Sequence, residues 1–251
     1  MTKVLLNGYL GRMGRFISDL ASQREDVEIV AGVDVNESSE NFGFNTYTSF
    51  ADVKEDVDVI IDFSNPSALA SLLEYATTNK VPAVICTTGL SEEQKASLNE
   101  ASKVVPVFFS ANMSIGINLV IELARKAAAI LYPDFNIEVV EAHHNQKLDA
   151  PSGTALMIAD GMKEVLDSDV YYEYNRAAKR EKRPENEIGI HAIRAGTIVG
   201  EHEVIFGGED EIITISHSAR SRKIFANGSL NAAVFLADKE PGMYSMKEMI
   251  D

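Results

Sequence analysis

The sequence predicts an α/β protein with an N-terminal Rossmann-type, doubly wound parallel sheet and a second α+β domain. In the first hundred or so residues, short β-branched runs alternate with helical patterns, which is typical of βαβ units. The run Val57–Phe63 is almost continuously apolar, as parallel strands covered on both faces are. From Gly189 to Ser218 the pattern changes to strand-like alternation, which indicates a different kind of domain.

The elements of the first domain follow from these runs and from the signals at their ends. Pro66, directly after Asn65, suits a first helical position, and Ser91 with Gln94 forms a capping-box pattern. The predicted strands are Lys3–Asn7, Val27–Asp34, Val57–Ser64, Val81–Thr87 and Val105–Phe109, and the predicted helices are Gly11–Gln23, Pro66–Thr78 and Glu92–Ser102.

The second half of the chain predicts fewer helices and a hairpin. Helices are expected at Ile115–Leu131, from about Ser152 to Leu166 and at Arg222–Ala237. Strands are expected at Ile137–Glu141, Glu203–Phe206 and Glu211–Ile215, and Gly207–Asp210 joins the last two strands as a hairpin. The last helix has an apolar face that suits packing on the first domain. The charged segment Asp167–Asn186 has no clear period, so it is interpreted as a mobile or oligomer-contacting excursion without predicted structure. The predicted domains are residues 1–114 with 222–251, and residues 115–221.

Composition excludes several classes of function. The 251 residues include 23 Lys and Arg against 38 Asp and Glu, a net charge of −15, which argues against nucleic acid or an anionic membrane as the main partner. Cys86 is the single cysteine, so an internal disulfide or a cysteine-based metal cluster is excluded and a reducing compartment fits. With no signal-peptide pattern and no long apolar run, we expect a cytoplasmic protein.

A glycine-rich turn follows the first predicted strand. Gly8 suits the tight turn, Gly11 lets the backbone approach a pyrophosphate, and Gly14 lets helix and strand pack closely. The spacing differs from the common G-x-G-x-x-G pattern, because Leu10 and Met13 occupy its second and third glycine places. An ordinary glycine-rich βα turn therefore stays open as an alternative to a dinucleotide site.

Asp34 lies at the end of the second predicted strand, twenty residues beyond Gly14. An acidic side chain at this place accepts hydrogen bonds from an adenosine ribose diol, although a lone Asp there is also a common turn residue. Val35 and Asn36 follow it without an Arg or Lys for a 2′-phosphate, which favours NADH over NADPH. Arg12 leaves some use of NADPH open.

The densest group of reactive side chains is the segment from Glu141 to Ala155. His143, His144 and Lys147 place up to three cationic donors near one ligand in an otherwise acidic chain. Gly153 and Thr154 then open a helix whose free N–H groups and hydroxyl form a carboxylate cradle. Together they predict a site for a small dianion; a charged loop followed by a helix cap is the alternative.

These motifs resemble those of the 4-hydroxy-tetrahydrodipicolinate reductase family, the dihydrodipicolinate reductases of lysine and diaminopimelate synthesis. The most specific is Glu-Ala-His-His at 141–144, followed by Lys-x-Asp-Ala-Pro-Ser-Gly-Thr-Ala at 147–155. The resemblance covers the chain: residues 8–14 match the cofactor loop, 87–89 and 111–114 the loops on the nicotinamide side, and 194–202 and 225–228 the C-terminal half.

The resemblance implies an enzyme that reduces the cyclic imine left when hydroxy-tetrahydrodipicolinate loses water, by hydride transfer from C4 of the nicotinamide. By motif position, His143 is the proton donor or acceptor, Lys147 the proton donor, His144 a substrate contact, and Gly153 and Thr154 the carboxylate binders. The implied cofactor-binding residues are Gly8, Tyr9, Leu10, Gly11, Arg12, Met13, Asp34, Cys86, Thr87, Thr88, Ala111, Asn112, Met113 and Ser114. No metal is implied.

The resemblance also implies a homotetramer built through the sheet of the second domain, which makes that domain the substrate-binding and oligomerisation domain. The residues alone indicate only that the hairpin around Glu203–Ile215 can pair between chains. Two departures lie near the expected nicotinamide: Cys86 replaces a frequent Gly, and Met113 a frequent Phe. Cofactor affinity and preference therefore depend on this chain's own residues, with Cys86 interpreted as a small buried side chain.

The residues also allow other functions. A related amino-acid or semialdehyde dehydrogenase would share the cofactor domain, but the Pro-Ser-Gly-Thr helix start suits a rigid dicarboxylate better. A non-catalytic dinucleotide sensor would need neither His143 nor Lys147. Metal binding is the weakest alternative, because the histidines have no recognisable ligand spacing; they are His143, His144, His191, His202 and His217.

Overall fold

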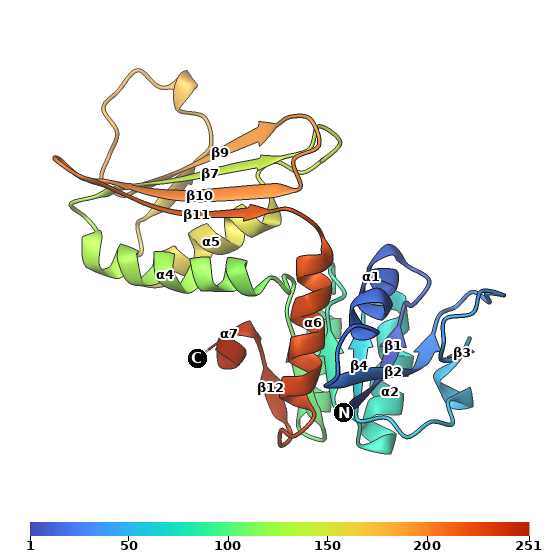
Figure 1. Ribbon diagram of the computed structural model, residues 1–251. Helices are drawn as coiled ribbons and strands as arrows, with labels where there is room; N and C mark the ends of the chain where they lie inside the picture. The colour runs from blue at the N-terminus through green and yellow to red at the C-terminus, as the bar shows by residue number, and fades with distance from the viewer. Residues whose placement is uncertain (251) are drawn as a thin grey trace. The chain divides into compact units, whose positions relative to one another are not determined.

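The computed structural model describes residues 1–250. The chain divides into two compact units, one from Met1 to Ile115 together with the segment from Arg222 onward, the other from Gly116 to Ser221 (Figure 1). Each unit is built around its own sheet. Among the described residues, no helix is both long and apolar enough to cross a membrane.

The first unit contains a seven-stranded sheet in which every neighbouring pair is parallel. Its order is β12 (Gly242–Tyr244), β6 (Pro106–Phe109), β5 (Ala83–Ile85), β4 (Val59–Asp62), β1 (Thr2–Asn7), β2 (Val27–Val33) and β3 (Asn45–Tyr47). The chain winds outward from β1 in both directions, so the strand order reverses beside this strand. The carboxyl end of β1 is therefore the topological switch point, where such sheets bind ligands.

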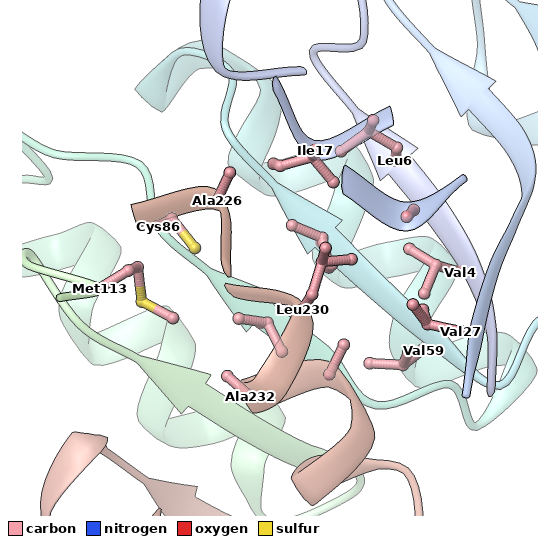
Figure 2. Packing of buried hydrophobic residues seen from close by; sticks show 14 of the residues in the cluster. Val4, Leu6, Ile17, Val27, Val59, Cys86, Met113, Ala226, Leu230 and Ala232 are labelled. Carbon is pink, nitrogen blue, oxygen red and sulfur yellow. The ribbon is translucent and has the colours of Figure 1, made fainter. Parts of the chain in front are cut away.

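Both faces of this sheet are buried, as the apolar runs predicted. Val4 and Leu6 of β1 pack into one core with the helices α1 (Arg12–Ala21) and α6 (Lys223–Leu236), whereas Leu5 packs into a second core. Figure 2 shows Ala226 and Leu230 of α6 in the first core, so the predicted packing of the last helix is confirmed. The second core is completed by α2 (Leu69–Asn79) and α3 (Glu92–Ser102).

Several boundaries differ from the predicted ones for local reasons. The helix predicted from Pro66 starts as a 3₁₀ turn, Pro66–Ala68, in which the Asn65 side chain accepts a hydrogen bond from the Ser67 amide, and α2 begins only at Leu69. The capping box of Ser91 is confirmed. Short elements that the sequence patterns did not predict are β3, β12, the 3₁₀ turn Phe50–Asp52 and the helix α7 (Met246–Ile250).

The second unit is α+β, as predicted. Its five-stranded sheet has the order β11 (Ile212–Ala219), β10 (Gly200–Gly207), β7 (Asn136–His143), β9 (Glu187–Arg194) and β8 (Tyr171–Glu173). Strands β10 and β11 form the predicted antiparallel hairpin, while β7 and β9 are parallel. The helices α4 (Ile115–Leu131) and α5 (Gly153–Lys163) lie on one face (Figure 1), where they cover the core of this unit.

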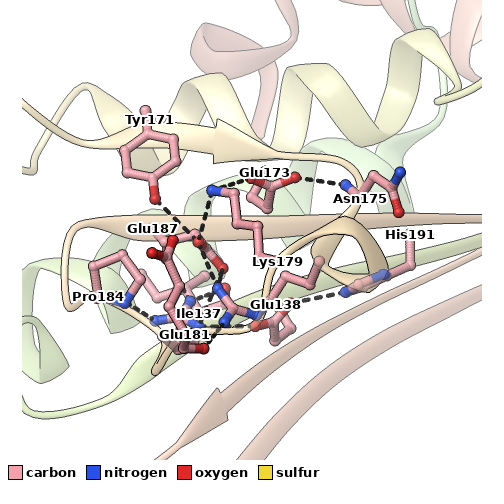
Figure 3. Close-up of polar contacts among 12 residues, drawn as sticks. Ile137, Glu138, Tyr171, Glu173, Asn175, Lys179, Glu181, Pro184, Glu187 and His191 are labelled. Atoms are coloured by element: carbon pink, nitrogen blue, oxygen red, sulfur yellow. Dashed lines mark hydrogen bonds and ion pairs between the residues drawn. The ribbon is translucent and has the colours of Figure 1, made fainter.

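The segment without predicted structure, Asp167–Asn186, is ordered by strand pairing and by charge. Its β8 pairs with β9, and a 3₁₀ turn follows at Arg176–Ala178. Lys179 reaches the fully buried carboxylate of Glu187 (Figure 3). Arg176 pairs with the same carboxylate, and Arg183 pairs with Glu138. Such an arrangement depends on partners distant along the chain, so it leaves no period in the sequence.

Candidate active site

The glycine turn after β1 has the geometry that the spacing predicted. Gly8 has a φ of +84°, and a Cβ there would lie 2.6 Å from the carbonyl oxygen of Phe63, so only glycine fits. Its amide donates to the carbonyl of Val33 at 2.8 Å, which fixes the turn at the end of β2. The turn thus holds the chain at the switch point of the sheet.

Helix α1 begins directly at this turn with its amide groups available. Gly11 is the N-cap residue, and no side chain caps the helix. A Cβ on Gly14 would overlap the carbonyl oxygen of Gly8 and the backbone of Tyr9, so glycine is required for the close packing of helix against turn. Uncapped amides and the positive end of the helix dipole form a site for an anion, so the turn fits the pyrophosphate of a dinucleotide.

Asp34 lies directly after β2 and is half-buried. Its Oδ1 accepts hydrogen bonds from the Asn36 amide at 3.1 Å and from the Asn36 side chain at 3.3 Å, so the residue also stabilises a turn. Arg15 of α1 is bound by both carboxylate oxygens of Glu40, at 2.8 and 3.0 Å, whereas Arg12 is exposed.

The ends of β1, β4 and β5 share a buried polar network that the sequence patterns did not predict. Asp62, 1% exposed, accepts hydrogen bonds from the Asn7 side chain at 2.8 Å and the Thr87 hydroxyl at 2.7 Å. The Ser64 hydroxyl donates to the same carboxylate at 2.6 Å. Burial raises the pKa of Asp62, although these hydrogen bonds oppose the shift. The network ties the first strand to the loop that begins at Cys86.

The predicted nicotinamide-side residues are divided between core and surface. Cys86 and Met113 are both buried in the core beside α6 (Figure 2), and burial raises the pKa of the Cys86 thiol well above its usual value. Thr88 and Ala111 are exposed, while Asn112 and Ser114 are buried, with the Ser114 amide donating to the Asn112 side chain at 2.9 Å. The departures at Cys86 and Met113 are therefore core side chains, and only their backbone is suited to a ligand.

In the second unit, β7 carries Glu141 and His143 on the same face at its carboxyl end. Glu141 is fully buried, and its Oε2 lies 2.6 Å from Nδ1 of His143. Burial lowers the pKa of His143, and the hydrogen bond and charge of Glu141 offset this only in part. The ring of His202 from β10 packs edge-on against His143, with centroids 5.3 Å apart.

Two further groups bind the Glu141 carboxylate. Arg194, at the end of β9, donates to both oxygens at 2.7 and 2.8 Å, and the amide of Ser152 donates to Oε1 at 3.0 Å. Burial raises the pKa of Glu141, but the bonds from Arg194, His143 and Ser152 outweigh it, so the pKa is lowered overall. Glu141 is therefore an ionised group at the centre of this cluster.

The loop between β7 and α5 carries the other predicted substrate residues. The amide of Lys147 donates to the carbonyl of His144 at 3.1 Å, and the Lys147 ammonium pairs with Asp149 at 2.9 Å. The Lys147 charge is close enough to His143 to contribute to lowering the pKa of that histidine. Lys147, 22% exposed at its side chain, and the half-buried His144 thus lie on the same loop as the histidine that the motif implicates.

The start of α5 is organised by Ser152, which caps the helix by accepting from the Ala155 amide at 3.1 Å. Gly153 is exposed and Thr154 half-buried in the first turn of the helix. The Ser152 hydroxyl also lies 3.2 Å from Nε2 of His202. The backbone start that was predicted as a carboxylate cradle is thus fixed by the same cluster that holds His143.

Motif reasoning assigned no role to Glu141, Arg194 or His202. A signal was present for Glu141, because residues two apart on a strand share a face and a buried carboxylate needs cationic or N–H partners. No pattern along the chain could identify Arg194 as that partner, since the two residues are 53 positions apart.

Comparison with known proteins gives matches along the whole chain. The family Dihydrodipicolinate reductase, N-terminus, matches residues 2–113, and Dihydrodipicolinate reductase, C-terminus, matches residues 116–250. A 4-hydroxy-tetrahydrodipicolinate reductase of Caldanaerobacter subterraneus subsp. tengcongensis is 51% identical over 250 residues, covering 100% of this chain and 98% of its own. That of Clostridium novyi is 48% identical with the same coverage.

Among solved structures, a dipicolinate-bound dihydrodipicolinate reductase from Paenisporosarcina sp. TG-14 superposes with a TM-score of 0.83. It is 25% identical and covers 98% of this chain and 97% of its own. The resemblance stated from the motifs is confirmed over the full length. The chain belongs to the dihydrodipicolinate reductase family, oxidoreductases of lysine and diaminopimelate synthesis that use a pyridine nucleotide.

Proposed function

We propose that this chain reduces the cyclic imine derived from 4-hydroxy-tetrahydrodipicolinate to tetrahydrodipicolinate. The observation that carries the proposal is the cluster in which ionised Glu141 holds His143 and the start of α5, with Lys147 on the connecting loop. Relatives across the full length bear the name of this activity, and one of them binds dipicolinate, a planar dicarboxylate. A non-catalytic dinucleotide sensor would have no use for such a cluster.

In this proposal residues 1–114 with 222–251 bind the cofactor, which supplies a hydride from its C4 atom. The turn at Gly8, Gly11 and Gly14 receives the pyrophosphate, because its amides are uncapped and its glycines allow close approach. Of the remaining contacts, those of Tyr9, Cys86 and Met113 use the backbone, since these side chains belong to the hydrophobic core. The others are Leu10, Arg12, Met13, Asp34, Thr87, Thr88, Ala111, Asn112 and Ser114.

We expect NADH to be preferred to NADPH. Asp34 presents a carboxylate to a ribose diol, and the residue after it, Val35, is 83% exposed and offers no positive charge. The Arg15 guanidinium is already held by Glu40, so it is poorly available to a 2′-phosphate. The exposed Arg12 is the cation that permits residual use of NADPH.

Residues 115–221 hold the substrate. Gly153 and Thr154, in the first turn of α5, bind one carboxylate, and His144 contacts the substrate beside them. Addition of a hydride to a conjugated imine builds negative charge on the ring, which an acid must neutralise. Lys147 carries that proton on its ammonium group, and His143 is the second group positioned for proton exchange or hydrogen bonding.

The same unit supports the proposal of a homotetramer. One face of its sheet is covered by α4 and α5, whereas β11 is an edge strand with exposed side chains along most of its length. A face and an edge supply two different surfaces, and a tetramer of D2 symmetry is built from different two-fold contacts. We place the enzyme in the cytoplasm, where a biosynthetic reductase meets its reduced cofactor.

The proposal is tested by following NADH and then NADPH oxidation with freshly generated 4-hydroxy-tetrahydrodipicolinate. We expect turnover with both and a higher kcat/KM for NADH. Lys147→Ala should lower kcat by roughly 10²-fold or more, the size of a lost general acid. Lys126→Ala, which removes an exposed lysine of α4, is the matched control and should leave turnover unchanged.

Three outcomes would contradict the proposal or a part of it. Absence of native turnover with either cofactor, despite measurable NADH binding, would favour a sensor or a dehydrogenase with another substrate. Native turnover that persists in Lys147→Ala would retain the reaction but remove Lys147 as the acid. A kcat/KM that is higher for NADPH would reverse the cofactor preference alone.

A further inference from the structure

We propose that Glu141 is a positioning residue that holds His143 as the neutral tautomer with hydrogen on Nδ1, leaving Nε2 as a hydrogen-bond acceptor. The inference rests on the proposed function for the participation of His143, and it selects between the donor and acceptor roles that the motif left open. As a consequence, Lys147 alone supplies the proton, and His143 only accepts a hydrogen bond.

The first step is that three acceptor positions of Glu141 are filled by groups that can only donate. Oε1 accepts from Arg194 at 2.7 Å and from the Ser152 amide at 3.0 Å. Oε2 accepts from Arg194 at 2.8 Å and faces Nδ1 of His143 at 2.6 Å. A carboxylate has about four lone-pair positions, and three of them accept from groups that can only donate, the Arg194 guanidinium twice and the Ser152 amide. Despite burial, these bonds lower the pKa of Glu141, so the oxygen that faces His143 carries no proton.

The second step follows from the chemistry of the pair. An ionised carboxylate has no hydrogen to give, so a hydrogen bond between Glu141 and Nδ1 of His143 requires the hydrogen to be on Nδ1. Glu141 is 0% exposed, and Arg194 neutralises its charge with two parallel hydrogen bonds. The hydrogen on Nδ1 is thereby determined by heavy-atom geometry.

The third step concerns the other nitrogen. Nε2 of His143 faces Gly200 at the start of β10, where even a single added Cβ would lie only 3.1 Å away. Glycine at this position avoids a close contact between a side chain and Nε2. Burial of the ring lowers the pKa of His143, so the ring is neutral near pH 7 and Nε2, which faces this glycine, carries no hydrogen.

The same carboxylate also fixes the predicted carboxylate cradle, because it accepts from the Ser152 amide just before α5. One buried group thus sets the orientation of the imidazole and the start of the helix. In the reaction, the hydride forms the new C–H bond and the displaced π electrons take a proton from the Lys147 ammonium. The neutral amine of Lys147 then regains its proton from water. His143 accepts a hydrogen bond at Nε2 throughout.

The tautomer can be measured in the free protein by ¹⁵N–¹H correlation spectra of histidine-labelled samples at neutral pH. His143 is assigned by the signal that disappears in His143→Gln. We expect a protonated Nδ1 and an unprotonated Nε2 in the native chain. A native spectrum with hydrogen on Nε2, or on both nitrogens, would overturn the proposal, whatever the chain's substrate proves to be.

The substitution Glu141→Gln tests the positioning role. Its amide group can donate to Nδ1, which forces the hydrogen of His143 to Nε2, so the spectrum should show the opposite tautomer and kcat should fall about 10²-fold. The matched control is Glu138→Gln on the same strand, which removes a carboxylate that contacts Arg183 and His191 (Figure 3). It should keep the native spectrum of His143 and the native kcat.

The readouts separate the inference from the proposed function. If the native chain does not reduce the proposed substrate but shows the predicted tautomer, the proposed function fails and the inference about Glu141 stands. A folded Glu141→Gln variant with the native tautomer and native kcat would remove the positioning role. A Glu138→Gln variant that loses as much activity would reduce Glu141 to a general structural role.

Discussion

Asp62 is a buried carboxylate whose hydrogen-bond partners, Asn7, Ser64 and Thr87, are all neutral. A buried charge without a cation is costly, and it persists where it has a role to perform. Because the carboxylate can only accept, the Thr87 hydroxyl must donate to it at 2.7 Å, which leaves the lone pairs of that hydroxyl directed elsewhere. Asp62 thus sets the polarity of a residue proposed to face the cofactor.

Asp62→Asn should separate this role from stability. The amide oxygen can still accept from Asn7 and Ser64, while the amide nitrogen donates to Thr87 and reverses the direction of its hydroxyl. We expect NADH to bind roughly tenfold more weakly, since one mismatched hydrogen bond costs about 1.4 kcal/mol. Fluorescence titration with NADH measures the affinity, and an unchanged dissociation constant would refute the role of Asp62.

The pH dependence of stability gives this variant a second readout. Burial raises the pKa of Asp62, so the folded chain binds this proton up to a higher pH than the unfolded chain does. The contribution of Asp62 to the free energy of unfolding therefore falls as pH rises from about 3.8 through the raised value. Relative to the native chain, Asp62→Asn should become more stable as pH rises above about 4 through the raised pKa of Asp62, as urea denaturation at each pH would show. A stability difference that stays constant with pH would contradict the raised pKa.

Residue by residue, the site shows which features a single sequence reveals. Gly8 and Gly14 were predicted because their constraint is local, a turn and a close approach within a few positions. Glu141 and Asp62 received no role because their partners come from other strands, with 53 positions between Glu141 and Arg194 and 25 between Asp62 and Thr87. Such pairs exist only after the sheet has formed.

At the scale of elements, α1 and α5 begin differently although each has a glycine in its first turn. A Cβ on Gly14 would overlap the backbone of Gly8 and Tyr9, whereas a Cβ on Gly153 would meet nothing within 4 Å. Backbone overlap cannot be relieved by a change of rotamer, so α1 would have to move away from β1. The start of α5 imposes no such restriction.

Gly14→Ala and Gly153→Ala form a matched pair. We expect the first to lower the free energy of unfolding by about 1–3 kcal/mol, the cost of overpacking. The second should be neutral or stabilising by up to about 1 kcal/mol, because alanine loses less entropy in a helix. Urea denaturation of both variants measures the difference, and equal losses would show that the glycine turn does not require close packing.

The elements themselves were predictable where their signal is long or strong. The hairpin of β10 and β11 and the helix α3 with its capping box have local patterns that suffice. The strands β3, β8 and β12 have three residues each, too few for a period, and they form only by pairing at the edges of existing sheets. Their prediction needs the sheet as well as the segment.

At the scale of the whole molecule, the second sheet has a face that α4 and α5 do not cover. Val204 and Phe206 of β10 are fully buried in the core under those helices, so Ile205 between them points to the opposite face. Val140 of β7 alternates in the same way beside the buried Val139. Both are half-buried apolar residues on the face through which we propose that chains associate.

Ile205→Glu tests that assembly. The added carboxylate would lie between Glu138 and Thr214 in the register of the sheet, and it would have to be desolvated in any contact made by this face. We expect the native chain to sediment as a tetramer and the variant as a smaller species. Val104→Glu, which puts the same charge on an exposed valine of the other unit, should remain tetrameric. If Ile205→Glu keeps the native mass and melting temperature, the tetramer is built through another surface. The edge strand β11 is then the first alternative to test, because its exposed side chains leave it open to pairing with a second chain.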